Sequence, residues 1–279
     1  SIFMVIATAV VAGQLRYINN KDLGYEHEHI LVLELQDEAS RAGAEVLMNR
    51  LTQNPMINEA VVSNYFPAIM TMNNSVDVAA DEGFRTFTAN VAQVTPDYEA
   101  FLGLEMAEGR FFDWDYQTDF SDAVVINEAA RRYFGWEEGL GKQISSGFAW
   151  PDGTSSANRK VIGVMRDFHY SSLARPIEPM VWYPMRNAGS YLQIRMNGTD
   201  IQQAIAAIEK EWKGFAPNSP LEYYFLEDVI GSMYNSQRVL STFFSVFACL
   251  CIIIAFIGLY GLSAYAVEQR TREIGIRKV

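Results

Sequence analysis

Charged side chains are missing from a long stretch near the end of the sequence. No Asp, Glu, Lys or Arg occurs between Arg238 and Glu268. Because an α-helix rises about 1.5 Å per residue, about 20 apolar residues cross the ~30 Å hydrocarbon layer of a membrane. The run exceeds that length, so it can span with some tilt. A buried helix of a soluble core is the alternative, but such helices rarely stay uncharged for so long. The sequence therefore predicts a transmembrane helix over residues 239–267.

Cysteine and basic residues are also scarce. The two cysteines, Cys249 and Cys251, both lie in the uncharged run. Two residues apart on a helix, they point to different sides and cannot easily bridge each other. The rest of the chain must therefore fold without a disulfide. The net charge of −11 argues against a nucleic-acid-binding protein, for which a basic patch is the usual mark, so we expect no nucleic acid as a partner.

Motifs of catalysis are absent. The sequence contains no GxxxxGK[ST], GxSxG or HExxH pattern. Asp167, His169 and Ser171 alternate along a strand, which does not give the chain of hydrogen bonds that activates a nucleophile. We interpret them as polar side chains that anchor a loop. His27 and His29 share a strand face but lack a third ligand nearby. We therefore expect no catalytic, cofactor or metal site and no enzyme activity in this chain.

The two ends of the sequence suggest how it crosses the membrane. Residues 1–15 are uncharged but too short to span alone, so we interpret them as the outer end of a truncated transmembrane helix. A cleaved signal peptide is the alternative, but the positive n-region is missing. Four basic residues come after the uncharged run, and basic residues next to a span favour the cytoplasmic side. Residues 16–238 are then extracytoplasmic, and residues 268–279 begin a cytoplasmic segment.

The region between the spans has a repeated pattern. Apolar strands at 30–35 and 57–65 flank an amphipathic helix over 40–54, and strands at 191–196 and 221–226 flank a helix over 200–214. A hairpin is predicted over 76–94, with further strands at 123–126 and 160–165. The fold class expected is α+β, with two βαβ units around a central insertion. From Asp228 the pattern predicts one continuous helix that runs through the span to Glu268.

Several segments carry a resemblance to a known family. The stretch EQRTREIGIRKV after the span resembles the segment that comes after a span in FtsX-like permeases of ABC transporters. The stretches LEMAEGRFF, AVVINEAARRYFGWEEGLGKQI and VIGVMRDFHYSSL are similar to parts of the MacB-like periplasmic core domain. The resemblance implies a multi-pass protein of the bacterial inner membrane. It also implies porter-like parts at 28–75 and 185–228, with a smaller inserted α/β subdomain at about 76–184.

The resemblance further implies a function and a set of partners. The chain would be a fragment of a permease subunit, used for export or for transmission of force, that couples ATP hydrolysis by a separate ATPase to rearrangement of the extracytoplasmic domain. The expected partners are an ABC ATPase subunit, a second permease copy or half, membrane lipid, and a periplasmic partner protein or exported substrate. The residues expected to contact the ATPase are the cytoplasmic coupling residues Glu268, Arg270, Arg272, Glu273, Arg277 and Lys278.

Small residues recur every three positions in the span. They are Ala255, Gly258, Gly261 and Ala264. Small side chains let a neighbouring transmembrane helix approach closely, although they are also simply common in spans. A two-span membrane receptor with an extracytoplasmic ligand-sensing domain is the alternative function. Such receptors usually continue past the span as a helix pair with heptad spacing, and the segment around Gly275 lacks that spacing.

Overall fold

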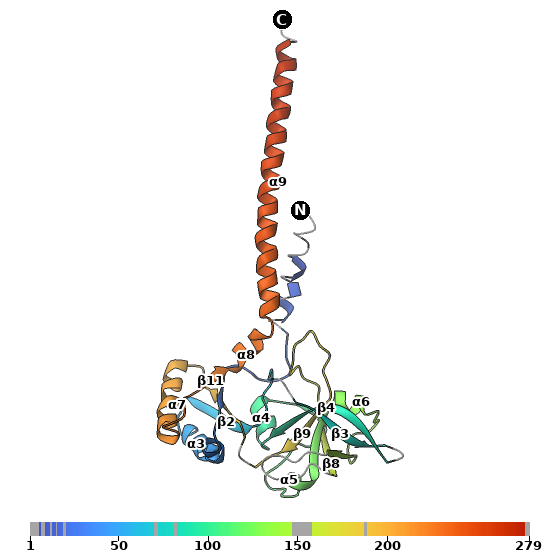
Figure 1. Ribbon diagram of the computed structural model, residues 1–279, viewed down its shortest axis with the longest axis vertical. Helices are drawn as coiled ribbons and strands as arrows, with labels where there is room; N and C mark the ends of the chain where they lie inside the picture. The colour runs from blue at the N-terminus through green and yellow to red at the C-terminus, as the bar shows by residue number, and fades with distance from the viewer. Residues whose placement is uncertain are drawn as a thin grey trace. The chain divides into compact units, whose positions relative to one another are not determined.

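The computed structural model describes most of the chain in two compact units (Figure 1). One unit is Asp22–Met233, and the other combines Ser1–Lys21 with Tyr234–Val279. The residues described are 6, 9–11, 13, 14, 16–18, 21–69, 72–80, 83–146, 158–186 and 189–276.

Both predicted strand–helix–strand motifs are present in the Asp22–Met233 unit, and their strands alternate in one sheet. The first is β1 (Ile30–Glu34), α3 (Ala44–Leu51) and β2 (Ile57–Ser63), with the short α2 (Glu38–Ala42) before α3. The second is β10 (Tyr191–Met196), α7 (Ile201–Phe215) and β11 (Tyr223–Phe225). The sheet order is β11-β1-β10-β2, and all neighbours are antiparallel. Each motif is therefore a split βαβ, because its two strands are separated in the sheet by a strand of the other motif.

The two main helices beside this sheet, α3 and α7, each bury one apolar face, as expected for the amphipathic helix pattern of the sequence. The apolar face of α7 buries Ala204, Ile208 and Trp212, and Asp200 caps its first turn by accepting from the Gln203 N–H. The apolar face of α3 buries Ala44, Leu47 and Leu51. Both faces share one core with the strand residues Leu31, Leu33, Leu192 and Ile194. Burial of these side chains supplies the main stabilisation of this part of the unit.

The remaining strands form a ring. The predicted hairpin is confirmed as β3 (Met72–Ala79) and β4 (Phe84–Val94), which pair as far as Ala79 and Phe84, while its turn residues Asp81 and Glu82 lie outside the described residues. The order continues β4-β3-β7-β8-β6-β9, and β9 then pairs with β4, which closes the strands on themselves. The other strands of the ring are β6 (Ala123–Asn127), β7 (Gln143–Ser146), β8 (Arg159–Met165) and β9 (Met180–Pro184), with β5 (Met106–Gly109) paired to β8.

One residue pair, Ser63 with Val94, joins the interleaved sheet to the ring through β2 and β4. The result is a mixed α/β fold. Division into porter-like parts and a separate inserted subdomain stays a prediction, since residues 22–233 form a single compact unit.

Short helices occupy the connections. Asn127 caps α6 (Glu128–Tyr133), because its side-chain oxygen accepts from the Ala130 N–H at 2.9 Å. The same side chain also binds the backbone of Glu178 and Met180, which fixes β9 beside β6. Two further helices are α4 (Tyr98–Leu102) and α5 (Asp119–Asp122).

The continuous helix predicted from Asp228 to Glu268 is wrong. The structure has α8 (Leu226–Ser232) and α9 (Asn235–Ile276), separated by a turn at Met233 and Tyr234. Gly231 and Ser232 precede the turn, and both are poorer helix formers than Ala. The Ser232 hydroxyl donates to the Val229 carbonyl at 2.7 Å, and Met233 N–H donates to Ile230, three residues back, rather than to Val229, four residues back. The helix therefore tightens and stops before the apolar run begins.

Candidate functional site

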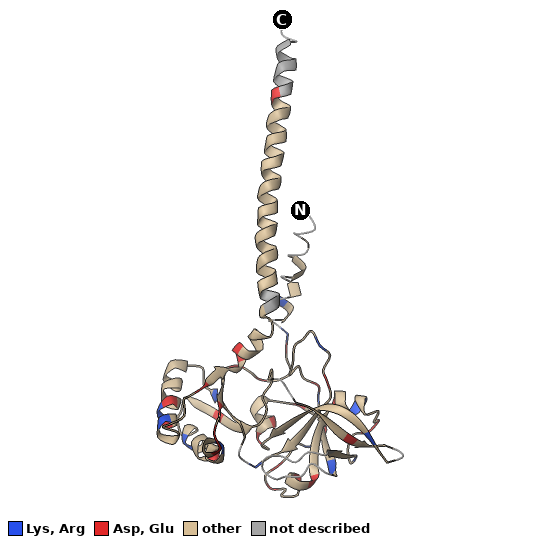
Figure 2. Ribbon diagram, viewed as in Figure 1, with Lys and Arg blue, Asp and Glu red and all other residues tan. Residues whose placement is uncertain are grey.

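The helix α9 contains the uncharged run. Within the described residues, one helix is long and apolar enough to cross a membrane, and its candidate span is Val239–Glu268. Figure 2 shows most of α9 free of the colours that mark charged residues. Only 6% of the most apolar window is buried inside the structure, which distinguishes it from the core helix of a soluble protein. Large apolar side chains such as Ile254, Phe256 and Tyr260 are more than 65% exposed along it. Exposed apolar surface of this extent marks contact with lipid or with another protein.

The small residues predicted to pack against another helix lie on the exposed part of α9. A Cβ added at Gly258 or Gly261 would have no atom within 4 Å in the described structure. Steps of three residues turn by about 60° around a helix of 3.6 residues per turn, so Ala255 and Ala264 face opposite sides. The four residues therefore follow a slanted path around α9 rather than one face. Their role in helix packing stays a prediction.

The predicted coupling residues begin at the end of the candidate span. Glu268 is exposed, and the backbone of Arg270, Arg272 and Glu273 continues the helix. Arg277 and Lys278 lie outside the described residues. The structure thus carries the helix beyond the uncharged run, while the coupling role stays a prediction.

The Asp167 side chain anchors a loop, as the sequence predicts. Its carboxylate accepts from the Ala129 N–H at 2.8 Å, at the start of α6, and pairs with the Arg132 guanidinium at 2.5 Å. The backbone N–H of His169 donates to the Leu23 carbonyl at 2.8 Å. The Asp167 carboxylate therefore joins this loop to the start of α6.

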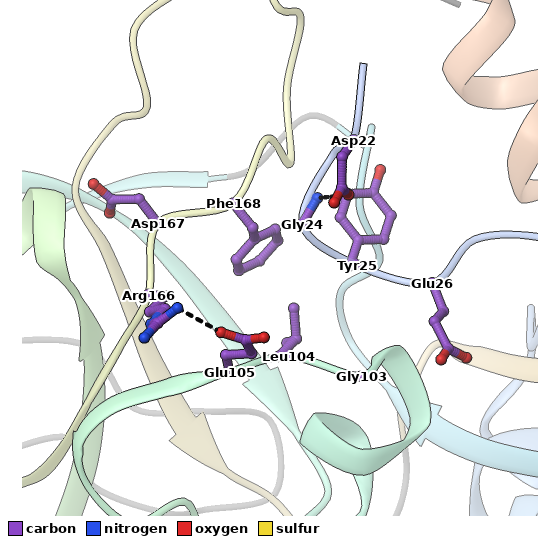
Figure 3. Close-up of a pocket in the computed structure, with 10 residues that line it drawn as sticks. All are labelled: Asp22, Gly24, Tyr25, Glu26, Gly103, Leu104, Glu105, Arg166, Asp167 and Phe168. Atoms are coloured by element: carbon purple, nitrogen blue, oxygen red, sulfur yellow. Dashed lines mark hydrogen bonds and ion pairs between the residues drawn. The ribbon is translucent and has the colours of Figure 1, made fainter. Parts of the chain in front are cut away.

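A cavity of about 470 Å³ opens beside this loop (Figure 3). Its walls carry the carboxylates of Asp22, Glu26, Glu105 and Asp167 together with the Arg166 guanidinium. Arg166 pairs with Glu105 at 2.8 Å, and Glu26 pairs with Arg195 at 3.2 Å. The volume suits a small ligand, but the carboxylates of Glu26, Glu105 and Asp167 are already paired with cations from the chain itself. Among the described residues there is also no group of His, Cys, Asp or Glu arranged to hold a metal ion.

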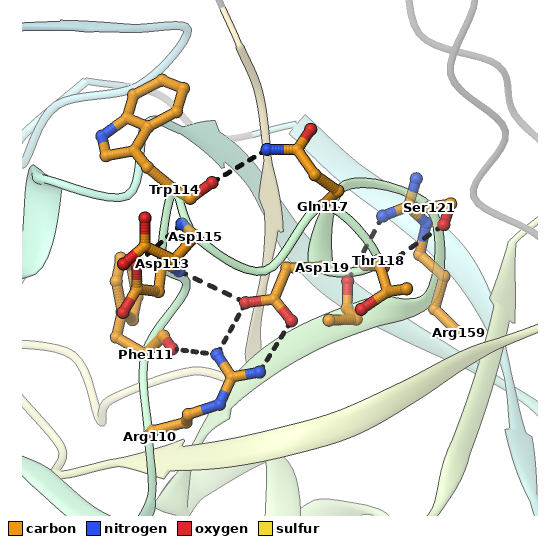
Figure 4. A network of polar contacts seen from close by, with 11 residues as sticks. Arg110, Phe111, Asp113, Trp114, Asp115, Gln117, Thr118, Asp119, Ser121 and Arg159 are labelled. Carbon is orange, nitrogen blue, oxygen red and sulfur yellow. Dashed lines mark hydrogen bonds and ion pairs between the residues drawn. The ribbon is translucent and has the colours of Figure 1, made fainter.

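A second polar network orders the loop before α5 (Figure 4). Arg110 donates to both carboxylate oxygens of Asp119, at 2.6 and 2.8 Å. Asp119 is 3% exposed, and hydrogen bonding to it raises the pKa of Arg110. The loop is tied further by the Asp113 N–H, which donates to Asp119, and by Gln117, which donates to the Trp114 carbonyl. The sequence does not predict this network, because Arg110 and Asp119 follow no fixed spacing and only the abundance of Asp marks the loop.

Taken together, these features define a mixed α/β domain followed in the chain by a long apolar helix, and the polar networks described in the domain are ion pairs that order its loops. Comparison with known proteins identifies the family. The model of the MacB-like periplasmic core domain matches residues 1–211. The chain belongs to this family.

Two curated relatives are named macrolide export ATP-binding/permease protein MacB. The protein from Chromobacterium violaceum is 27% identical over 207 residues, covering 68% of this chain and 30% of the relative. The one from Shewanella sp. is 22% identical over 241 residues, covering 80% of this chain and 35% of the relative. The chain thus spans about a third of the length of these relatives.

A solved structure shares the fold. The periplasmic region of MacB from Actinobacillus actinomycetemcomitans aligns with a TM-score of 0.53 at 14% identity. The alignment covers 78% of this chain and 98% of that one. At this identity the likeness supports the fold alone, and it agrees with the mixed α/β fold of residues 22–233.

Proposed function

We propose that this chain is part of the permease component of a bacterial ABC transporter of the inner membrane, used for export or for transmission of force. The observation that supports this is the family match over residues 1–211 in a chain that continues into α9, a long apolar helix with almost no buried surface. In this proposal residues 22–233 are extracytoplasmic, and Val239–Glu268 crosses the membrane.

In this proposal, ATP hydrolysis takes place on a separate ATPase unit and not on the residues that the structure describes. The curated relatives are named as both ATP-binding and permease proteins, so an ATP-binding unit is the expected source of work. A second permease copy or half would complete the membrane part, and lipid would cover the exposed apolar side chains of α9. The cytoplasmic end of α9, from Glu268 onward, is the segment through which ATP-driven movement would enter.

The turn at Met233 and Tyr234 changes how such movement reaches the extracytoplasmic domain. A single stiff helix would transmit a push directly, but α8 and α9 are separate helices. In the proposed mechanism α9 moves as one body, and the turn converts that movement into a rearrangement of the domain through α8. Hinges are typically a few residues at element ends, which fits this position.

Accessibility labelling in intact bacteria tests the topology. Cys249 and Cys251 are first replaced by Ser, and single cysteines are then placed as Asn218→Cys in the domain or Thr271→Cys beyond the span. An impermeant thiol reagent should label position 218 from the periplasm, and label position 271 only after the inner membrane is opened. Labelling of 271 from outside, or of 218 only after opening, would contradict the proposed topology.

The receptor alternative requires a different segment after the span. A sensor would continue into a cytoplasmic signalling helix pair, whereas a permease requires further spans and an ATPase. The comparisons give the receptor no support, because the curated relatives are named as export ATP-binding/permease proteins.

A further inference from the structure

A narrow cleft lies between the helical face of the interleaved sheet and the loop before α5. Its apolar lining comes from Met48 on α3, Val62 on β2 and the ring of Trp114. We call this the Trp114 cleft. Its volume is about 50 Å³, well below the ~300–1,000 Å³ typical of small-molecule sites. The cleft therefore has room for the end of one apolar side chain rather than for a whole ligand.

The Trp114 ring stands at the mouth of this cleft on an ordered loop. It is 39% exposed, its indole N–H donates to Asp97 at 2.8 Å, and its ring packs against Phe120. Figure 4 shows Trp114 projecting from the loop that the Arg110–Asp119 pair holds. Exposed tryptophans that are already held in place lose little entropy on binding, which is why such residues dominate many protein interfaces.

A buried hydroxyl in the lining lacks a partner. Thr95 is 5% exposed, and its hydroxyl makes no hydrogen bond within the part of the chain that the structure describes. A buried polar group without a partner is destabilising, because it has given up its hydrogen bonds to water. An occupant that brings a backbone amide into the cleft would relieve this cost, whereas a purely apolar occupant would not.

The charge around the cleft is predominantly negative. Glu45 and Asp97 line it, and Asp113 and Asp115 flank Trp114 on the loop. Arg186 is the only basic residue among the lining residues, and it is engaged with Gln117 at 2.7 Å and with the Phe120 ring at 4.1 Å. Complementary charge on a partner would therefore be positive.

We propose that the Trp114 cleft binds a segment of a partner protein in which an apolar residue is flanked by Lys or Arg. The apolar side chain fills the space between Met48, Val62 and Trp114, and a backbone amide of the segment bonds the Thr95 hydroxyl. The flanking cations lie against Asp113 and Asp115. Figure 1 shows α5 at the end of the unit opposite α8, so the loop is remote from the point where the chain leaves for α9. This inference rests on the proposed function in one respect only, which is that the partner protein is located in the extracytoplasmic compartment.

A defined peptide pair tests the proposal on the purified chain in detergent. Fluorescence anisotropy compares a dye-labelled Gly-Lys-Leu-Lys-Gly peptide with Gly-Glu-Leu-Glu-Gly. The basic peptide should bind at least about tenfold more tightly, and Trp114→Ala should weaken that binding by about tenfold or more, as expected for an anchoring tryptophan. Tyr133→Ala, which removes a 51% exposed ring from α6, is the matched control and should leave binding unchanged.

A second variant separates charge from folding. Asp113→Asn with Asp115→Asn keeps the acceptor that Asp113 provides to the Asp115 N–H but removes both charges. It should retain the parent melting temperature and lose most of the salt dependence of peptide binding. Equal binding of the two peptides by the parent, or undiminished binding by Trp114→Ala, would overturn the proposal. Because the measurement uses purified protein, its outcome is independent of the topology experiment.

Discussion

Asp119 and Arg110 differ sharply in how far each is removed from water. The Asp119 side chain is 3% exposed, while that of Arg110 is 41% exposed. The buried carboxylate is tolerated because it accepts bonds from Arg110 and from the Asp113 N–H. By contrast, both members of the Arg166–Glu105 pair are more than 60% exposed. The Arg110–Asp119 pair is both bidentate and partly buried, so it should matter much more for stability than the exposed Arg166–Glu105 pair.

The first prediction compares these two pairs. Asp119→Ala should lower the free energy of unfolding by about 2 kcal/mol, since it removes three charge-assisted hydrogen bonds, two from Arg110 and one from the Asp113 N–H. Water can partly replace Asp119 as the partner of the half-exposed Arg110. Glu105→Gln, the control, should change it by less than about 0.5 kcal/mol. Urea denaturation followed by tryptophan fluorescence measures both. Similar losses in the two variants would show that the loop before α5 is not held by Asp119.

At the scale of elements, α9 starts at Asn235, and the distance of a residue from this start decides how much a substitution to proline destabilises the helix. Ser236 is the second residue of the helix, where the backbone N–H has no acceptor within the helix. Ser245 lies in the interior, and its hydroxyl donates to the Ser241 carbonyl at 2.8 Å. Proline fits the first turn of a helix but breaks a hydrogen bond and clashes in the interior.

We therefore expect Ser236→Pro to cost about 1 kcal/mol or less, and Ser245→Pro to cost about 3 kcal/mol or to kink the helix. Circular dichroism of the purified protein in detergent, recorded during heating, measures both effects. If Ser236→Pro loses as much helix as Ser245→Pro, then α8 and α9 form one continuous helix in the purified protein, and the turn at Met233 and Tyr234 is absent there.

Most elements could be predicted from the sequence because their periodicity is strong. The faces of α3 and α7 and the capping of α6 by Asn127 all come from local patterns. The features that could not be predicted depend on distant residues. No recognisable spacing in the sequence marks these pairings. They are the interleaving of β1 with β10, the closure of β4 on β9 and the ion pair of Arg110 with Asp119. The helix break after Ser232 could not be predicted because a single glycine is usually tolerated in a helix.

At the scale of the whole molecule, the chain is two units, and it passes between them at Lys21–Asp22 and again at Met233–Tyr234, the joint that leads into α9. If movement passes through this joint, α9 should keep its own shape while its position relative to the domain changes. Val246 and Tyr265 are 54% and 62% exposed on α9, and Lys213 is exposed near the end of α7. These positions can carry spin labels without disturbing a core.

Pulsed electron paramagnetic resonance tests this in the complete transporter, with Cys249 and Cys251 replaced. Between the nucleotide-free and ATP-bound states, the distance between labels at Lys213→Cys and Tyr265→Cys should change. The distance between Val246→Cys and Tyr265→Cys should stay the same, since both lie on one helix. A change confined to the second pair would mean that α9 itself bends and that the joint is passive.

The interleaved sheet also bears on how the protein is made. Ser63 and Gln193 bond to each other across 130 positions of the chain. During synthesis β1 and β2 emerge long before β10 and β11, and without β10 between them they cannot complete a sheet. The strands of the closed ring are all available earlier, so they are free to assemble first. While the ring forms, the apolar face of α3 lacks β10 and α7, with which it shares its core, and we expect the newly made domain to depend most on chaperones during that interval.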